Sequence, residues 1–525
     1  MYKKQFIILM LFLLPLFFGC SSNKNTKTDD KESNYTEKYR PQFHFSPPKG
    51  WMNDPNGMVF YAGEYHLFYQ HYPDSTVWGP MHWGHAVSKD MVHWENLPIA
   101  LYPDSLGLIF SGSAVVDWKN TSGLGTAENP PLVAIFTHHN MNREKSGSTD
   151  VENQGIAFSL DKGRTWKKYE NNPVLLNQGS RDFRDPKVLW HQDTQKWNLI
   201  LSAHDRVQIF SSENLKDWTF ESEFGSDAGA HGGVWECPDL FPLKVNGGDQ
   251  TKWVMIVNIN PGGPNGGSGV QYFVGDFDGH AFTAASKETS WLDYGRDNYA
   301  GVTWSDVPVE DGRRLFLGWM SNWDYANLVP TEVWRSAMTV PRELKLEEAD
   351  GKYQVVSEPV TELNQLRDQA GKITFATEQI SGEKQLETKD INLNQCELVL
   401  DLEPGENAAD SLGLILENPL GEWIKIGYSA KSKQFFVDRT KSGNMSFSDR
   451  FTGIDYAPYE IGKQLQLHLY LDAASVELFV DGGKLVMTDC FFPTENFSKL
   501  SLFAEKGEFK LAGGSITNLS GIWGK

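Results

Sequence analysis

The heptapeptide SKDMVHW at residues 88–94 decides the fold, because versions of it recur along the chain. The segment SLDKGRTW at 159–166 resembles it, and so does SSENLKDW at 211–218. A looser copy, DFDGHAF, lies at 276–282. Each copy is a polar turn that follows a short apolar run and is closed by an aromatic residue, which is typical of a β-hairpin.

The spacing of these turns predicts a repeat architecture. The closing aromatic residues lie at positions 94, 166, 218 and 282. This period fits one four-stranded blade per repeat with loop insertions, and the turns resemble the Asp-box hairpins of β-propellers. One more unit fits before Pro341, so we predict a five-bladed β-propeller over residues 41–342.

The remainder of the chain predicts a second β domain. Residues 343–368 mix charges with few turn residues and are predicted to be a linker with a short helix near 361–367. Strand patterns return over residues 369–525. The run at 464–471 alternates leucine with polar or aromatic residues, and Asp481-Gly482-Gly483 is a hairpin turn. We therefore predict a C-terminal β-sandwich and an all-β chain.

The composition limits the function. The chain has 525 residues, which is too long for one core, and a net charge of -20. An acidic chain repels phosphate backbones, so nucleic acid is not an expected partner. The sequence contains 18 tryptophans. Indole rings suit a carbohydrate site, where they cover the apolar faces of sugars.

The N-terminus predicts export. Lys3 and Lys4 precede an almost wholly apolar run at 5–19 that is too short to span a bilayer, so residues 1–20 are expected to be a signal peptide. The junction Gly19-Cys20 resembles a bacterial lipobox, with Cys20 lipidated after cleavage. Residues 21–40 would be a flexible tether. We expect a lipid-anchored protein of the cell envelope that meets the membrane only through this anchor. A plain secretory signal is the alternative.

Three cysteines remain beyond Cys20. Their positions, Cys237, Cys396 and Cys490, show no metal-ligand spacing. A bridge between Cys396 and Cys490 is possible, although burial as small hydrophobic side chains in strands is the simpler interpretation.

Three carboxylates lie where a turn meets a strand. Asp54 lies in WMNDPNG at 51–57, Asp185 follows Arg184 in RDFRDP at 181–186, and Glu236 lies in VWECPD at 234–239. In a propeller, equivalent strand ends from different blades converge at one end of the central channel. The spacing places the three residues in different blades, so we expect them to meet. Simple turn capping and ion pairing is the alternative interpretation.

Glycoside cleavage is the chemistry that needs such a cluster. One carboxylate attacks the anomeric carbon, and a second, protonated carboxyl group donates to the leaving oxygen; retaining enzymes hold the two about 5–5.5 Å apart. The acid must stay protonated near neutral pH, so burial and like charge must raise its pKa.

The motifs identify a family resemblance that covers residues 39–525. The chain resembles glycoside hydrolase family 32, the β-fructosidases, which include invertases, inulinases and levanases. The carboxylate motifs named above carry this resemblance, and further matching segments are WGPMHWGHA at 78–86, FSGS at 110–113, GWMSNW at 318–323 and WRSAMTVPREL at 334–344. The resemblance implies a five-bladed propeller followed by a β-sandwich.

The resemblance also implies residue roles. Asp54 would be the nucleophile, Glu236 the acid/base, and Asp185 the transition-state stabiliser. Arg184 would tune the charge of Asp185, and Cys237 would influence the pKa of Glu236. The residues expected to line the subsite for a terminal fructose are Asn53, Gln70, Trp78, Phe110, Ser111, Asp297 and Trp319. No metal and no organic cofactor is implied.

The expected function is hydrolysis of β-fructans such as levan and inulin, with sucrose as a further substrate. The run at 297–304 looks more like exo-levanases and exo-inulinases than plant invertases. Two departures from the family pattern, QHYP at 70–73 and DNY at 297–299, concern the subsite rather than the three carboxylates. The alternatives are an endo-acting levanase on the cell surface and a non-catalytic fructan-binding lipoprotein. Linkage preference and oligomeric state stay open.

Overall fold

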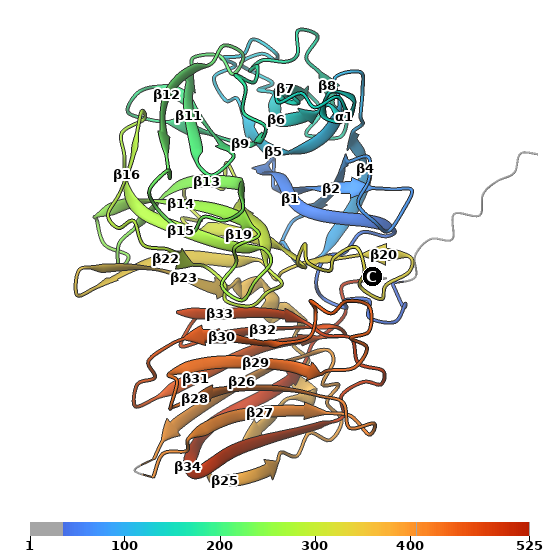
Figure 1. Ribbon diagram of the computed structural model, residues 1–525, viewed down its shortest axis with the longest axis vertical. Helices are drawn as coiled ribbons and strands as arrows, with labels where there is room; N and C mark the ends of the chain where they lie inside the picture. Colours follow the sequence, from blue (N-terminus) through green and yellow to red (C-terminus); the bar gives the residue numbers. More distant parts are fainter. Residues whose placement is uncertain (1–34, 406, 524–525) are drawn as a thin grey trace, which may run out of the picture. The chain divides into compact units, whose positions relative to one another are not determined.

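The computed structural model describes residues 35–405 and 407–523 (Figure 1). The predicted signal peptide, Cys20 and residues 21–34 of the predicted tether lie outside the described residues. No helix in the part of the chain that the structure describes is long and apolar enough to cross a membrane.

Five antiparallel sheets form the first domain. Blade one contains β1 (Gly50–Tyr61), β2 (Glu64–Tyr72), β3 (His82–Ser88) and β4 (Trp94–Leu101), with β20 (Trp334–Arg335) added parallel to β1. Blade two contains β5 (Leu108–Val116), β6 (Leu132–His139), β7 (Glu152–Ser159) and β8 (Lys167–Lys168), and the short helix α1 (Met141–Lys145) lies between β6 and β7.

The remaining blades follow in chain order. Blade three contains β9 (Phe183–His191), β10 (Lys196–Ala203), β11 (Val207–Ser212) and β12 (Thr219–Phe224). Blade four contains β13 (Val234–Lys244), β14 (Thr251–Asn260), β15 (Gly269–Phe277) and β16 (Phe282–Ala284), and β17 (Ser290–Trp291) also pairs with β15. Blade five contains β18 (Tyr299–Thr303), β19 (Arg314–Met320), β22 (Arg342–Ala349) and β23 (Lys352–Pro359), and β21 (Ala337–Met338) also pairs with β19.

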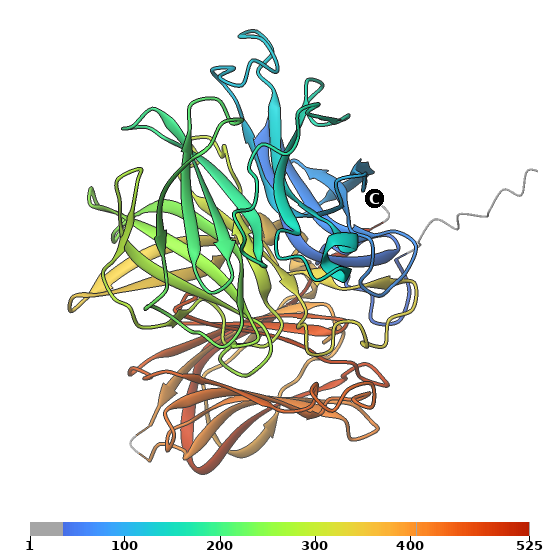
Figure 2. The same ribbon diagram turned by 45° about the horizontal axis from the view of Figure 1, so that its top comes forward.

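The first strand of each blade lines the centre of the ring. Strand β1 contacts β5, β5 contacts β9, β9 contacts β13, β13 contacts β18, and β18 contacts β1 again. Figure 2 shows the blue, green and yellow blades following one another around a common centre. This arrangement confirms the predicted five-bladed propeller and brings equivalent ends of five strands together.

The recurring turns connect the third and fourth strands of the first four blades. In blade one, Asp90 Oδ1 accepts hydrogen bonds from Ser88 Oγ at 3.0 Å and from the backbone N–H of His93 at 2.8 Å. Asp161, Asn214 and Asp278 accept backbone N–H groups in the same way. A short polar side chain that satisfies the turn's own N–H groups explains why the motif recurs.

The predicted linker at 343–368 is wrong over most of its length. Arg342–Ala349 and Lys352–Pro359 pair as β22 and β23 and complete the fifth blade. Their turn lacks the Ser–Asp pattern: the backbone N–H of Gly351 bonds the Glu348 carboxylate at 2.7 Å instead. The short helix expected near 361–367 is present as the 3-10 helix η1 (Thr361–Leu366).

The C-terminal domain is the predicted β-sandwich, and its described strands belong to one 11-stranded sheet. Its elements after η1 are η2 (Gln369–Gly371), β24 (Ile373–Phe375), β25 (Glu378–Gln385), β26 (Cys396–Pro404), β27 (Ser411–Glu417), β28 (Trp423–Ser429), β29 (Gln434–Lys441), β30 (Ile454–Pro458), β31 (Leu465–Asp472), β32 (Ser475–Val480), β33 (Leu485–Cys490) and β34 (Lys499–Asn518). The 20-residue β34 pairs with β24, β25, β26 and β27. The alternating leucines of β31 are buried in the core of this domain.

Buried ion pairs join the two domains. The side chain of Arg342 in β22 lies 3.0 Å from Asp293 in the propeller and also contacts Glu477 in β32. All three side chains are almost fully buried. Burying these charges costs desolvation free energy, but breaking the pair would leave an uncompensated charge in the interior. The contact between Arg342 and Glu477 therefore holds the sandwich against the fifth blade.

Candidate active site

Asp54, Asp185 and Glu236 lie together in one pocket of about 280 Å³. They belong to β1, β9 and β13, and each lies near the start of its strand. The structure therefore brings together three carboxyl groups that are far apart in the sequence. Other residues that line this pocket are Asn53, Gln70, Trp78, Phe110, Ser111, His139, Glu144, Val151, Glu152, Arg181, Asp182, Arg184 and Trp323.

Asp54 is held by neutral donors. Asn53 Nδ2 donates to Asp54 Oδ1 at 2.8 Å, and Ser111 Oγ donates to Asp54 Oδ2 at 2.7 Å. The indole N–H of Trp51 orients Asn53 through a 2.6 Å hydrogen bond to its Oδ1. The pairing of β1 with β2 shifts register between Met52 and Pro55, which turns this segment toward the pocket. These contacts fix the direction of the Asp54 carboxylate.

Asp185 is buried and has an unusual backbone. Its φ angle is 65°, a left-handed conformation that is uncommon for a residue other than glycine. Its N–H bonds Thr137 Oγ1 at 3.0 Å, and its Oδ2 accepts the N–H of Cys237 at 3.0 Å. Burial raises the pKa of Asp185 to about 8; Arg184 opposes this shift, and the negative charges of Glu236 and Asp54 add to it.

Glu236 lies between a cation and a phenol. Arg184 donates to Glu236 Oε1 from Nε at 3.1 Å, and the Tyr299 hydroxyl donates to Oε2. Burial raises the pKa of Glu236, Arg184 lowers it, and the charge of Asp54 raises it again. A carboxyl group in this setting retains its proton to a higher pH than a solvated one.

Arg184 is the hub of a wider charge network. Its Nη1 lies 2.8 Å from Asp182 and 3.2 Å from the buried carboxylate of Glu152. His139 Nδ1 contacts that same carboxylate at 3.0 Å. The sequence pointed to Arg184 beside Asp185 but missed Glu152, Asp182 and Tyr299 as its companions around Glu236. Tyr299 lies in the DNY segment at 297–299, which the sequence indicated only as a departure from the family's subsite pattern.

The thiol of Cys237 links two of the carboxylates. Its Sγ lies 3.4 Å from Asp54 Oδ2 and 3.6 Å from Asp185 Oδ2. Burial raises the pKa of this thiol well above its ordinary value, and the nearby negative charges act in the same direction. The neutral thiol can therefore donate to these carboxylates. Cys237, Cys396 and Cys490 are all free thiols, so the possible bridge between Cys396 and Cys490 is absent from the described structure.

Five of the seven predicted subsite residues line the pocket. They are Asn53, Gln70, Trp78, Phe110 and Ser111. Phe110 stacks on His139 with ring centroids 4.3 Å apart, and Trp78 packs edge-on against Phe110 at 6.1 Å. Aromatic walls with amide and hydroxyl groups between them are the lining that a sugar requires.

The other two predicted subsite residues do not line it. Asp297 is fully buried, and Arg439 of the sandwich lies 2.8 Å from its Oδ2. Its backbone N–H bonds Thr488 O of β33, so it faces the second domain rather than the pocket. Trp319 is also fully buried, with its ring 5.0 Å from that of Trp323. Trp323, the last residue of the same GWMSNW segment, lines the pocket together with Trp78, and the sequence did not single it out.

The pocket has the parts for acid-assisted displacement. Asp54 is a carboxylate that neutral donors orient, whereas burial and like charge favour the protonated forms of Asp185 and Glu236. Because three close carboxyl groups resist being ionised together, the cluster retains a proton at neutral pH. A nucleophile and a proton donor therefore occur side by side.

Comparisons with known proteins agree with this arrangement. The family model described as "Glycosyl hydrolases family 32 N-terminal domain" matches residues 44–359. The model described as "Glycosyl hydrolases family 32 C terminal" matches residues 362–519. The levanase of Bacillus subtilis (strain 168) is 48% identical over 99% of this chain and 76% of its own length. The extracellular exo-inulinase of Aspergillus niger is 37% identical over 93% of this chain and 96% of its own.

A solved structure shares both domains. The crystal structure of the exo-inulinase from Aspergillus awamori superposes with a TM-score of 0.86 at 36% identity. The match covers 93% of this chain and 100% of that one.

Proposed function

Because the chain belongs to glycosyl hydrolase family 32 and is a β-fructofuranosidase-type glycoside hydrolase, we propose that it removes terminal fructose units from levan and inulin, and cleaves sucrose, with retention of configuration. The single observation that carries this proposal is the meeting of Asp54, Asp185 and Glu236 in one pocket lined by aromatic, amide and hydroxyl groups.

In the first step, an Asp54 oxygen attacks the anomeric carbon of the terminal fructose. Glu236 donates its proton to the glycosidic oxygen as the bond to that carbon breaks, which leaves a fructosyl ester on Asp54. In the second step, Glu236, now ionised, accepts a proton from water. The water oxygen attacks the same carbon and releases the Asp54 carboxylate.

Asp185 and Arg184 support both steps. Asp185 holds sugar hydroxyl groups as positive charge develops on the ring. Arg184 limits how far burial raises the pKa of Glu236, because its guanidinium group stabilises the ionised form that the second step needs.

We place the enzyme among exo-acting hydrolases. The pocket volume of about 280 Å³ lies at the small end of the range for ligand pockets, which is roughly 300–1,000 Å³. A pocket of this size suits the end of a polysaccharide chain better than the middle of one. The similarity to a levanase and to an exo-inulinase supports fructan as the substrate class. An endo-acting levanase and a non-catalytic fructan-binding protein are the competing functions.

Product analysis tests the proposal. Wild-type enzyme is incubated with levan, inulin and sucrose, and products are followed by chromatography from the earliest times. Fructose alone supports exo-cleavage, whereas an early ladder of oligosaccharides would establish the endo alternative.

A variant tests the nucleophile: Asp54→Ala should lose at least about 10³-fold in kcat. Asp74→Ala removes an exposed carboxylate from the same blade and should act like wild type. Equal hydrolysis by Asp54→Ala and wild type would exclude the nucleophile.

We also propose that a lipid on Cys20 holds the enzyme on the cell envelope. Cys20 follows the apolar run of the N-terminus. Labelled palmitate should enter the wild-type chain and not Cys20→Ser, and that variant should move to the soluble fraction. Incorporation that persists in Cys20→Ser would refute the anchor.

A further inference from the structure

A second cavity of the propeller lies away from the three carboxylates. It has a volume of about 520 Å³, and neither Asp54, Asp185 nor Glu236 lines it. Its walls are the later parts of β5, β9 and β13 with the β18–β19 connection, including Val116, Trp190 and Phe241. Strands β9 and β13 carry Asp185 and Glu236 near their starts, so the cavity lies toward the opposite end of the central channel.

Strand geometry sets the separation of the two sites. Asp185 and Trp190 are five residues apart on β9, which corresponds to roughly 16 Å. Lys187 lies between them: its Nζ donates to Thr303 O at 2.6 Å and lies 3.1 Å from Asp239 Oδ2. Lys187 and its two partners therefore lie between the far cavity and the carboxylate cluster.

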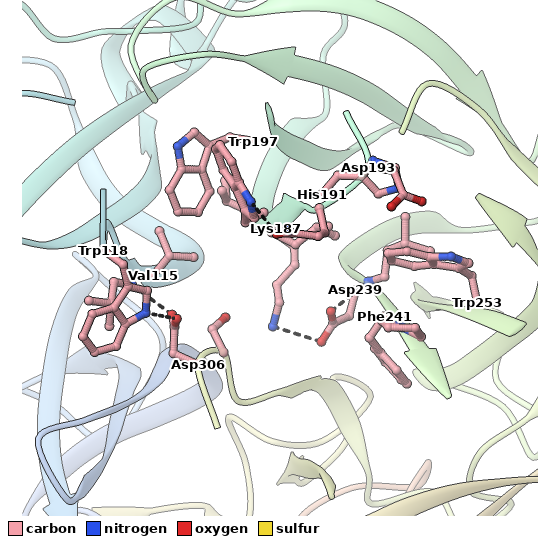
Figure 3. A pocket seen from close by; sticks show the side chains of 18 of the residues that line it. Val115, Trp118, Lys187, His191, Asp193, Trp197, Asp239, Phe241, Trp253 and Asp306 are labelled. Carbon is pink, nitrogen blue, oxygen red and sulfur yellow. Dashed lines mark hydrogen bonds and ion pairs between the residues drawn. The ribbon is translucent and has the colours of Figure 1, made fainter. Parts of the chain in front are cut away.

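Aromatic rings form much of the cavity wall. Trp118, Trp190, Trp197, Trp253 and Phe241 all line it. Trp118 is 58% exposed, yet its indole N–H donates to Asp306 Oδ1 at 2.8 Å, which holds the ring in place (Figure 3). An exposed tryptophan fixed by a hydrogen bond at the edge of a cavity is a preformed stacking surface.

Polar groups with unused capacity face the same space. Among the described residues Asp306 has no ion pair; its oxygens accept only from Trp118 and from the N–H of Val116 at 2.9 Å. Arg314 also has no carboxylate partner among the residues that the structure describes, and the buried Nε of Arg314 has no hydrogen bond there. Figure 3 shows Lys187 directed toward Asp239, with Asp306 on another side of the cavity.

These groups select the chemistry of a ligand. Lys187 and Asp239 neutralise each other, but an anion would still meet the carboxylate of Asp306, and a cation would meet the guanidinium group of Arg314. A neutral polyhydroxylated molecule satisfies both signs, because its hydroxyl groups donate to carboxylates and accept from guanidinium groups. Its apolar ring faces can cover the indoles. The volume lies within the range of ligand pockets, roughly 300–1,000 Å³.

We propose that this cavity is a second, non-catalytic binding site for a short neutral oligosaccharide, here a segment of fructan. The choice of fructan rests on the proposed function, whereas the class of ligand rests on the cavity alone. A site remote from the cleavage pocket would hold the enzyme on a long polymer while chain ends enter the active site.

Binding stoichiometry tests the site. Full-length Asp54→Ala protein, which should not cleave its ligand, is titrated calorimetrically with short inulin and levan oligosaccharides. Two molecules should bind per chain. The double variant Asp54→Ala/Trp118→Ala should bind one. Phe220→Ala in the Asp54→Ala background removes another exposed aromatic side chain outside the cavity and should still bind two. One molecule per chain in every protein would identify the cavity as a solvent-filled end of the channel and overturn the proposal.

Kinetics provide the second readout. In the catalytically active chain, Trp118→Ala should leave kcat/KM on sucrose unchanged and raise KM on long levan up to about tenfold. Trp118→Phe keeps an aromatic face and should recover part of the difference. An equal loss on sucrose and levan would contradict a separate site. Binding of inorganic phosphate in place of sugar would overturn the ligand class.

The two proposals fail in different ways. If wild type hydrolyses no fructan, the proposed function fails, and titration with other neutral oligosaccharides still reports on the cavity. If hydrolysis is normal and only one oligosaccharide binds per chain, the second site fails alone.

Discussion

Arg184 Nη2 lies 3.0 Å from Glu236 Oε1, so a guanidinium group directly contacts the proposed acid/base. Burial raises the pKa of Glu236, and Arg184 is the strongest opposing influence. Arg184→Met should therefore raise that pKa further. The alkaline limb of the kcat/KM profile, which reports the protonated acid in the free enzyme, should move upward by about one pH unit.

The matched variant for this experiment is Arg184→Lys, which keeps the charge and loses the planar fork. Its alkaline limb should move less than that of Arg184→Met. Arg184→Met also leaves Glu152 and Asp182 without their cation, so its folding is checked by circular dichroism. An alkaline limb that moves downward in a folded Arg184→Met protein would contradict the assignment of Glu236 as the acid.

Cys237 should be chemically inert despite its place beside the proposed catalytic carboxylates. Its side chain is 4% exposed, and burial raises its pKa well above the ordinary value. Alkylation requires the thiolate, so iodoacetamide at pH 7.5 should neither inactivate the native enzyme nor label Cys237. The same reagent in guanidinium chloride should label it, as mass spectrometry can show. Rapid inactivation that fructose prevents would reveal a reactive thiolate.

Asp297 should affect stability and not substrate binding. It is fully buried, and both Arg439 Nη1 and the Tyr325 hydroxyl lie 2.8 Å from it. Asp297→Asn removes the charge that balances Arg439, at a cost of about 3–5 kcal/mol for breaking a buried pair. Its midpoint in guanidinium chloride should fall, while KM for sucrose stays unchanged.

The double variant Asp297→Asn/Arg439→Met sharpens that test. Removing both charges should recover part of the stability that Asp297→Asn loses, because no guanidinium group is then left without its nearest carboxylate. The recovery should be incomplete, since Arg439 also lies 3.7 Å from Asp455 and 3.9 Å from Asp489. A raised KM for sucrose in Asp297→Asn, at unchanged stability, would return this residue to the subsite.

Four of the five predicted blades were recognised from one local turn motif. Asp90, Asp161, Asn214 and Asp278 each satisfy the N–H groups of their own turn, so the information lies within about eight residues. The fifth hairpin uses Glu348 for a similar purpose and leaves no matching pattern. For that reason β22 and β23 were mistaken for a linker.

The site shows the same division between local and distant information. Asp54, Asp185 and Glu236 are readable because each lies in a short motif at the start of a strand. Glu152 contacts Arg184 across 32 positions of sequence, and Tyr299 contacts Glu236 across 63. Those partners depend on how the blades close. Asp297 was assigned to the subsite because its burial also depends on a distant segment: Arg439 of the sandwich covers it.

His44 should make the domain interface sensitive to alkaline pH. Its Nδ1 lies 2.7 Å from Asp472, and its Nε2 lies 2.9 Å from Glu477. Burial alone would lower the pKa of His44, but the hydrogen bonds and charges of these two carboxylates overcome it and raise the pKa to about 9. The imidazolium therefore helps to hold the N-terminal segment against β31 and β32.

The sign of the effect follows from proton linkage. Because the folded pKa exceeds the unfolded value of about 6.5, the stabilisation is complete below pH 6.5 and is lost as pH rises through 9. The loss should be on the order of 3 kcal/mol. Unfolding in guanidinium chloride is measured from pH 6 to pH 10 for wild type and for His44→Gln, which cannot titrate. Stability should fall more steeply in wild type; parallel curves would show that His44 does not carry the proton.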